Sequence, residues 1–177
     1  ESGAHVILAL KAFAQFSTFP LIRKTLPGAT ASSLNEARLA REEFGGEVHI
    51  CAPAYAPGEI DALLKLGDHI VFNSTSHWAQ HRETVRVHND ALKAQGQPPI
   101  QCGLRINPEH SEGTVPLYDP CAPGSRLGVR AKDLDDWTAA NGGAAQALRD
   151  ISGLHFHTLC EQGLEPLRRT LHAVEER

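Results

Sequence analysis

The fold is decided by residues 69–107, HIVFNSTSHWAQHRETVRVHNDALKAQGQPPIQCGLRIN, in which two apolar runs flank one helical stretch. HIVFN at 69–73 and IQCGLRIN at 100–107 are short and rich in apolar residues, which is typical of buried strands. Residues 75–96 have the length of a long helix and end at Gly96. Two strands joined by a helix predict a βαβ unit and therefore a parallel sheet.

The same alternation extends in both directions from this unit. Toward the N-terminus, strands are expected at 5–10, 29–31 and 48–53, and helices at 18–26, 33–44 and 57–67. Toward the C-terminus, the pattern predicts a helix from 132 to 149 with a break at 141–143, a strand at 151–159 and a helix from 163 onward. The chain therefore contains six predicted βα units, and its strands are expected to be apolar on both faces, as in a sheet covered by helices.

Two architectures accommodate such units, an open doubly wound sheet and a (β/α)8 TIM-type barrel. A doubly wound sheet that binds nucleotides usually has a glycine-rich turn after its first strand, whereas Lys11-Ala12-Phe13 stands there in this chain. We therefore expect the barrel. Because a barrel needs about 250 residues and the 177 residues lack any methionine, residues 1–177 are expected to be an incomplete N-terminal barrel domain within a longer protein.

Composition and charge exclude several classes of protein. Apolar residues make up 41% and charged residues 21%, which is ordinary globular composition. The net charge of −4 offers no basic patch for nucleic acid or a membrane surface, and no apolar run is long enough to span a bilayer. The four cysteines lack zinc-site spacing, and no signal-peptide pattern opens the chain, so a cytoplasmic protein with free thiols is expected.

Candidate site residues are those expected at the C-terminal ends of the strands, where barrel enzymes carry their active sites. Lys11 ends the first strand on the face of Ile7 and Ala9, where a desolvated amine would suit covalent attachment to a carbonyl group. The alternative is a lysine that reaches into solvent. Arg105 shares that inner face on the fifth strand, and its alternative role is a structural arginine in a salt bridge.

The last predicted strand carries His155 and His157 on one face. Such a pair can bind zinc, here with Cys160 and Glu161, or can stack on a planar cofactor, or can cap the barrel. Residues 108–128 form a connection much longer than most βα loops, which predicts a mobile lid over the substrate, with a plain insertion as the alternative.

Five short motifs resemble the fold-type III pyridoxal-phosphate decarboxylases, a family that includes ornithine and diaminopimelate decarboxylases. In chain order they are ALKAF (9–13), ATASSLNEARLA (29–40), LRINPE (104–109), SRLG (125–128) and GLHFHTLCE (153–161). The longer motifs LRINPEHSEG and HFHTLCE are similar to the branch that acts on carboxynorspermidine or carboxyspermidine. The resemblance covers essentially the whole chain.

This resemblance implies an alanine racemase-like barrel followed by a β-rich domain, a pyridoxal 5'-phosphate cofactor and a homodimer. It places the Schiff-base lysine on Lys11, the histidine that stacks on the pyridine ring on His157, and the arginine near the phenolic oxygen on Arg105. Glu36 matches a glutamate near the lysine, and Cys160 stands where the family has a small hydroxyl residue near the phosphate. The glycine-rich phosphate loop, the acid that pairs with the pyridine nitrogen and the cross-subunit residues are expected further along the chain.

The implied activity is decarboxylation of a carboxylated polyamine to norspermidine or spermidine, with Lys11 and His157 as catalytic residues and without a metal. A decarboxylase of the diaminopimelate or ornithine type is the first alternative. A metal-dependent barrel hydrolase that uses His155, His157 and Glu161 is an alternative from another class, and a cofactor-carrying barrel without decarboxylase activity is a third.

Overall fold

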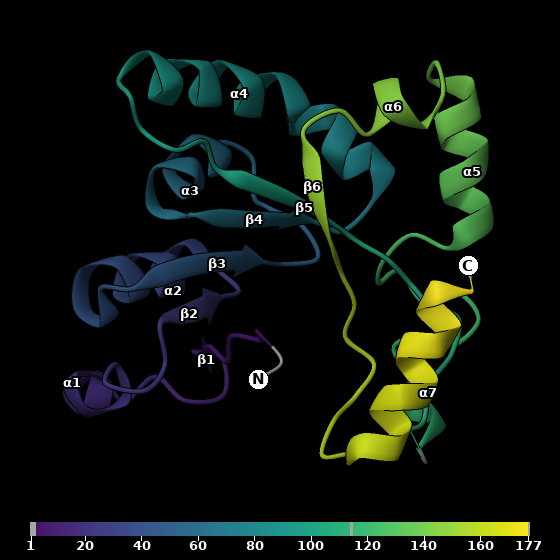
Figure 1. Cartoon of the computed structure of the whole chain (residues 1–177), viewed down its shortest axis with the longest axis horizontal. Coiled ribbons are helices and arrows are strands. Elements are labelled where there is room, and N and C mark those ends of the chain that lie inside the picture. The colour runs from purple at the N-terminus through teal and green to yellow at the C-terminus, as the bar shows by residue number, and fades with distance from the viewer. Residues whose placement is uncertain (1–2, 114, 177) are drawn as a thin grey trace.

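The computed structural model describes residues 3–113 and 115–176, and their backbone forms one six-stranded parallel sheet. The strands are β1 (Leu8–Ala9), β2 (Gly28–Ala31), β3 (Glu47–Cys51), β4 (His69–Phe72), β5 (Gln101–Arg105) and β6 (Ile151–His155). They lie in chain order from β1 to β6, and every neighbouring pair is parallel. In Figure 1, β2 to β5 run side by side in this order. A doubly wound sheet reverses its strand order at a switch point, so the observed order is that of a barrel.

Helices follow each of the strands. They are α1 (Phe19–Ile22), α2 (Leu34–Leu39), α3 (Ile60–Leu66), α4 (Thr75–Ala94), α5 (Ala131–Ala140), α6 (Ala144–Ala147) and α7 (Leu164–Glu175), with short turns η1 (Phe16–Thr18), η2 (Ala40–Phe44) and η3 (Pro116–Tyr118). The predicted break at 141–143 separates α5 from α6. Figure 1 shows α7 on the opposite side of the molecule from α1. In the described part of the chain, no helix combines the length and the apolar character needed to cross a bilayer.

Serine side chains fix the starts of two helices. Ser33 Oγ accepts a hydrogen bond from the backbone N–H of Glu36 at 3.2 Å, and Ser74 Oγ accepts one from His77 N–H at 3.1 Å. These bonds satisfy amide groups that have no partner within the first turn of a helix. The Glu36 carboxylate accepts in return from the backbone N–H of Ser32 at 2.7 Å. Ser33 and Glu36 therefore form a variant of the capping box, with the Ser32 amide in place of the amide of the cap residue.

One face of the sheet carries the core. Val48, Ile50, Ile70, Phe72 and Leu104 are at most 1% exposed and belong to the same buried cluster as apolar side chains of α3 and α4. The alternate residues point to the other face, which helices do not cover. On β3 and β4 that face carries Glu47, His49 and His69, so the expectation of strands apolar on both faces is wrong there. A sheet closing into a barrel keeps this second face inside.

The two outer strands are shorter than expected. β1 covers Leu8–Ala9 rather than 5–10, and β6 covers Ile151–His155 rather than 151–159. Each lies at an edge of the sheet and pairs with one neighbour among the described residues. An edge strand forms backbone hydrogen bonds with one neighbour only, so fewer of its residues keep strand geometry. Lys11 and His157 consequently lie in loops just beyond the C-terminal ends of β1 and β6.

Candidate active site

The inner face of the sheet brings distant strands together at their C-terminal ends. Cys51 ends β3 and His155 ends β6, and Cys51 Sγ lies 3.6 Å from His155 Nε2. These strands are separated by β4 and β5 in the sheet. Side chains three strands apart can meet only if the sheet curves strongly around this face. Arg105 ends β5 and is the register partner of His155, so the concave face gathers a thiol, an imidazole and a guanidinium.

Arg105 is a buried cation without a counter-ion. The residue is 8% exposed, and its side chain makes neither a hydrogen bond nor an ion pair with any residue in 3–113 or 115–176. Burial lowers its pKa, while the Cys51 and Cys121 thiols act in the opposite direction. The alternative of a salt-bridged structural arginine is therefore wrong for the described residues. A guanidinium in this state is a ready site for an anionic ligand group, because burying an unpaired charge is costly.

The two histidines of the HFH motif are neutral near pH 7. Burial lowers the pKa of His155 to about 4, with further contributions from the positive charges of Arg105, His157 and Lys11. The pKa of His157 is also lowered, by burial and then by Lys11 and Arg105. Burial raises the pKa of Cys51, which keeps the thiol protonated beside His155. Since Cys51 carries no negative charge at neutral pH, it does not neutralise Arg105.

Lys11 lies within electrostatic range of this group, as its effect on both histidines and on Cys51 shows. Its own side chain is exposed. The expectation of a desolvated amine is therefore wrong for this structure, because β1 ends two residues earlier and Lys11 sits in the turn that follows. Leu10 takes the buried position instead, at 2% exposure.

The segment 108–128 folds over the loop that follows β6. Between them lies a cavity of about 480 Å³, lined from the first segment mainly by Val115, Tyr118 and Leu127 and from the second by residues 157–162. In the latter segment the buried Thr158 Oγ1 and Gln162 Oε1 have no hydrogen-bond partner among the described residues. The cavity has the size of a small-molecule site.

Glu112 fastens this segment to α7. Its carboxylate accepts two hydrogen bonds from the Arg169 guanidinium, at 2.7 and 2.8 Å, and its backbone carbonyl accepts from Gln162 Nε2 at 2.8 Å. His110 Nε2 lies 2.8 Å from the same carboxylate. Arg169 and His110 hold the pKa of Glu112 at about 2. The Glu112–Arg169 ion pair thus anchors the N-terminal part of the expected lid to α7.

The other end of the segment is fixed by Asn73, which follows β4. Asn73 Nδ2 donates to the carbonyl of Arg126 at 2.8 Å, and Asn73 Oδ1 accepts from the backbone N–H of Gly128 at 3.1 Å. Gly128 has a φ of +84°, and a Cβ there would lie 2.5 Å from the backbone of Ile106. Only glycine fits this position, which explains the end of the SRLG motif. Sequence reasoning missed Asn73. The feature that could have revealed it is its position as a polar residue directly after a buried strand.

The remaining predicted residues fall at the same end of the sheet. Glu36 caps α2 through the Ser32 amide just beyond β2, and among the described residues it forms no ion pair with Lys11. Cys160 is exposed and lines the cavity beside His157. The alternative zinc site is not formed by His155, His157 and Glu161: within the described ranges, the one group of three suitable ligands is Glu47, His49 and His69.

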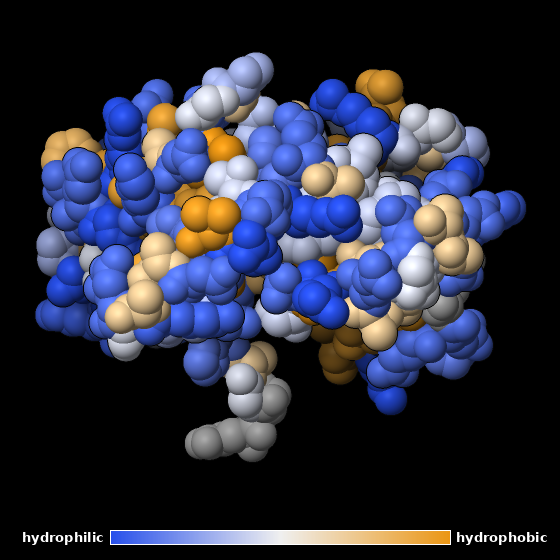
Figure 2. Space-filling view, turned by 90° about the horizontal axis from the view of Figure 1, so that it is seen from above, coloured by the Kyte–Doolittle hydropathy of each residue, from blue (hydrophilic) through white to orange (hydrophobic). Residues whose placement is uncertain are grey.

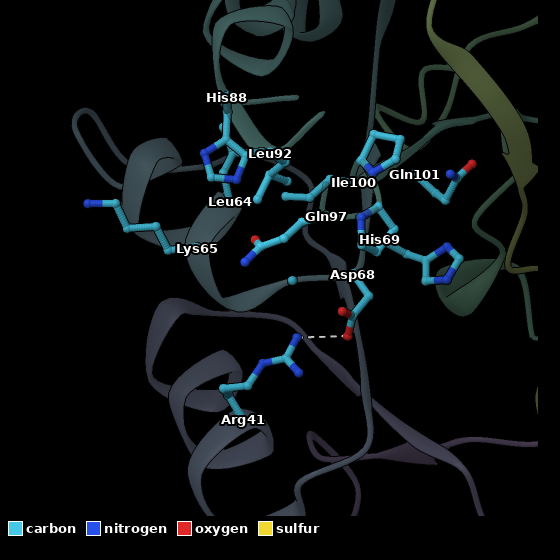
Figure 3. A pocket seen from close by; sticks show the side chains of 13 residues that line it. Arg41, Leu64, Lys65, Asp68, His69, His88, Leu92, Gln97, Ile100 and Gln101 are labelled. Carbon is cyan, nitrogen blue, oxygen red and sulfur yellow. Dashed lines mark hydrogen bonds and ion pairs between the residues drawn. The ribbon is translucent and has the colours of Figure 1, made fainter. Parts of the chain in front are cut away.

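A second cavity, of about 500 Å³, opens at the opposite end of the strands (Figure 3). His69 and Gln101, which begin β4 and β5, contribute to its lining. Three charged side chains line it, namely Arg41 and Asp68, which bind each other at 2.7 Å, and Lys65, which is exposed. The cavity therefore lacks the buried cation that marks the Arg105 end.

No family model matches the chain, but curated relatives and solved structures do. The chain is 46% identical to the carboxyaminopropylagmatine decarboxylase of Synechocystis sp. over 97% of its length, and 37% identical to the carboxynorspermidine/carboxyspermidine decarboxylase of Campylobacter jejuni over 100%. These alignments cover 39% and 41% of the relatives, so the chain spans about two fifths of their length.

Two solved structures extend the comparison. The carboxynorspermidine decarboxylase of Campylobacter jejuni, in complex with norspermidine, superposes with a TM-score of 0.75 at 35% identity, over 99% of this chain and 39% of that one. The diaminopimelate decarboxylase of Helicobacter pylori, in complex with L-lysine, shares the fold with a TM-score of 0.69 at 19% identity, over 98% and 42%. Over almost its whole length, this chain is thus a homologue of part of the carboxynorspermidine/carboxyspermidine decarboxylases, with the partial barrel of the fold-type III decarboxylases.

Proposed function

We propose that this chain is part of a pyridoxal-phosphate-dependent decarboxylase that acts on a carboxylated polyamine. The observation that carries the proposal is Arg105, a buried guanidinium that has no counter-ion in the described part of the chain and lies beside two neutral histidines at the C-terminal end of the sheet. Barrel enzymes bind their substrates at this end. The homology to decarboxylases of this substrate class supports the same reading.

The described residues fit the cofactor in charge and type. Lys11 offers an exposed primary amine for covalent attachment, His157 offers a neutral ring to place against the pyridine, and Arg105 offers a cation for an anionic oxygen. Cys160 and Thr158 line the adjacent cavity and are proposed to lie near the phosphate. When bound, the cofactor supplies the electron sink for the pair left behind as carbon dioxide departs.

The protonation states of the protein's own side chains then set the charge around Arg105 and Lys11. Cys51 keeps its proton and lies beside the neutral His155, with Sγ 3.6 Å from Nε2, so neither group competes with an anionic ligand for Arg105. The low pKa of both histidines avoids two further positive charges beside Lys11 and Arg105. The segment 108–128 covers the cavity and limits access of water to it.

The substrate is proposed within one chemical class. The relatives' names specify carboxynorspermidine, carboxyspermidine and carboxyaminopropylagmatine, which share a carboxylated amine and differ in the group at the distal end. We place carboxynorspermidine or carboxyspermidine first, as the motifs LRINPEHSEG and HFHTLCE indicate. Carboxyaminopropylagmatine is the second candidate, favoured by the 46% identity to the Synechocystis enzyme. We further propose that the full-length protein is a homodimer located in the cytoplasm.

The test is an assay of carbon dioxide release by the protein at its full natural length, loaded with pyridoxal phosphate. The five substrates are the three carboxylated polyamines, diaminopimelate and ornithine. Release from a carboxylated polyamine supports the proposal, and the substrate with the highest kcat/KM identifies the distal group. Activity on diaminopimelate or ornithine alone would overturn the substrate class. A colourless protein that loses a hydrolase activity on chelation would overturn the reaction itself.

A further inference from the structure

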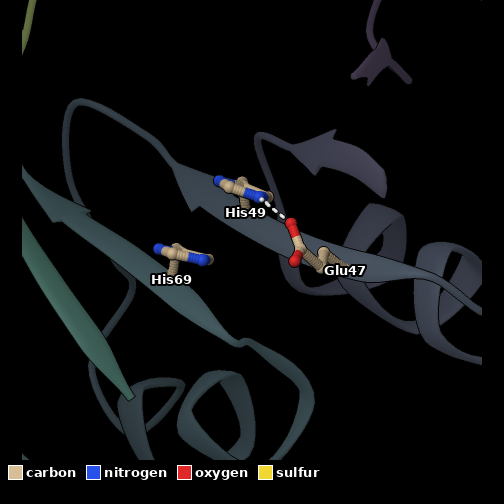
Figure 4. A group of neighbouring side chains, drawn as sticks. All are labelled: Glu47, His49 and His69. Atoms are coloured by element: carbon tan, nitrogen blue, oxygen red, sulfur yellow. Dashed lines mark hydrogen bonds and ion pairs between the residues drawn. The ribbon is translucent and has the colours of Figure 1, made fainter. Parts of the chain in front are cut away.

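The N-terminal ends of the strands carry a second group of chemically active side chains. Glu47 and His49 lie on β3 and His69 begins β4, and all three lie on the inner face of the sheet (Figure 4). His49 and His69 are register partners on neighbouring parallel strands. Cys51 and Arg105 lie at the far ends of their strands, and this group adjoins the candidate active site, because Cys51 follows His49 by two residues on β3 and one cavity is lined by His49, His69 and His155.

The three ligand atoms lie close enough together to hold one metal ion after a small rearrangement. One nitrogen of each histidine and one carboxylate oxygen of Glu47 all lie within 4.8 Å of one another. His49 Nε2 and Glu47 Oε2 are 3.3 Å apart. That distance equals the edge of a tetrahedron with metal–ligand bonds of roughly 2.0–2.1 Å, the values found for Zn²⁺ with nitrogen and oxygen.

The third ligand needs only a side-chain rotation. The rings of His49 and His69 are stacked, with centroids 4.1 Å apart and planes 6° from parallel. Stacked rings direct their lone pairs in parallel, so His69 must tilt for both nitrogens to bind one ion. The His69 ring has room for this movement, because a cavity of about 360 Å³ adjoins both histidines.

Neighbouring charges favour a cation here. The nearest other carboxylate, Asp68, is engaged by Arg41 at 2.7 Å and by the backbone N–H of Val48 at 2.8 Å. Glu47 is therefore the acidic ligand, and its partner in the described structure is His49 alone.

We propose that Glu47, His49 and His69 bind one divalent transition-metal ion of the Zn²⁺ type, which cross-links β3 to β4 at the N-terminal end of the barrel. Two imidazoles and a carboxylate suit Zn²⁺, Co²⁺ or Cu²⁺ better than Mg²⁺ or Ca²⁺, which prefer oxygen ligands. Three protein ligands leave a fourth position for water or a further residue. No local sequence motif marks this group, because its ligands come from two strands. Since His49 and His69 are paired across β3 and β4, a bound ion would stabilise this part of the sheet.

The test uses the full-length, cofactor-loaded protein without an affinity tag. Zn²⁺ is titrated by calorimetry, and Cu²⁺ is bound for electron paramagnetic resonance, where nitrogen hyperfine lines count the imidazole ligands. We expect one high-affinity site with two nitrogens. His49→Gln and His69→Gln should each remove one nitrogen and weaken Zn²⁺ binding by at least tenfold, and Glu47→Gln should weaken it while keeping both nitrogens.

His172→Gln is the matched control, because His172 also pairs with a glutamate, Glu176, but lies exposed on α7. It should leave the stoichiometry, affinity and spectrum unchanged. Wild-type protein that binds no Zn²⁺ above micromolar affinity overturns the proposal. So does a spectrum that survives His49→Gln and His69→Gln together, since the copper then sits elsewhere. Retained cofactor absorbance in each variant shows that the protein is folded.

Discussion

Lys11 is the residue whose chemistry decides the proposed mechanism. In the full-length protein, borohydride should fix pyridoxal phosphate to the peptide that contains Lys11, since a primary amine is the group that condenses with the aldehyde. Lys11→Ala should abolish the yellow colour and lower kcat by several orders of magnitude. Lys11→Arg should do the same, because a guanidinium stays protonated at neutral pH and is not a usable nucleophile. Lys93→Ala, at an exposed position of α4, serves as the control, and a label on any other peptide would remove Lys11 from this role.

Arg105 should show opposite effects on stability and on binding. The cofactor-free structure gives its charge no acidic partner among the described residues, so Arg105→Met should leave the melting temperature of the apoprotein unchanged or raise it. A lost charge-assisted hydrogen bond costs about 1.5–3 kcal/mol, so the variant should weaken binding of pyridoxal phosphate or of the substrate by roughly 10- to 100-fold. Thermal melting and cofactor titration measure the two effects. Arg86→Met, which removes an exposed ion pair on α4, should alter neither property, and an apoprotein destabilised by Arg105→Met would mean that the guanidinium is structural.

At the scale of elements, the segment 108–128 should depend on Glu112. Its folded pKa of about 2 lies below the usual value of 4.5, so the Glu112 interactions stabilise the fold fully above pH 4.5 and are lost as the pH falls toward 2. Glu112→Gln should therefore loosen the segment already at pH 7 and raise KM. Hydrogen exchange of the amides in 108–113 and 115–128 measures the change, which acidification of the wild type toward pH 2 should begin to reproduce. Glu83→Gln, which breaks an exposed pair on α4, is the control, and unaltered exchange in Glu112→Gln would show that other contacts hold the segment.

The elements that the sequence predicts well are those with strong local signals. Residues 69–107 gave β4, α4 and β5 because apolar runs, a serine cap and a glycine stop coincide there. The edges of β1 and β6 were overestimated, because strand length depends on neighbours that the local sequence does not reveal. The burial of Arg105 without a counter-ion, the Cys51–His155 contact and the Glu47–His49–His69 group were not predicted, since each joins side chains across strands. The sequence placed Cys51 and Arg105 inside predicted strands, at 48–53 and 100–107, but only the curvature of the sheet brings Cys51 to His155.

At the scale of the whole molecule, residues 1–177 produced by themselves should self-associate. β1 and β6 form unpaired edges of the described sheet, and apolar side chains lie exposed on β6 and α7, namely Leu154, Leu164, Leu167 and Leu171. Figure 2 shows separate apolar patches on an otherwise hydrophilic face. Unpaired edges and exposed apolar residues are the features through which sheets aggregate, and sedimentation or light scattering measures the outcome.

A substitution at the edge separates this explanation from general instability. Leu154 is 63% exposed on β6, next to backbone groups with no strand beyond them. Leu154→Lys should make residues 1–177 more soluble, because a charge at an edge strand opposes pairing with another chain. If further barrel units cover β6 in the full-length protein, the same substitution should lower its melting temperature there, because a buried lysine is costly. Opposite effects in the two contexts would support a barrel completed by additional chain. A soluble, monomeric and active 1–177 would contradict it, because a sheet with two open edges would then be the whole working unit.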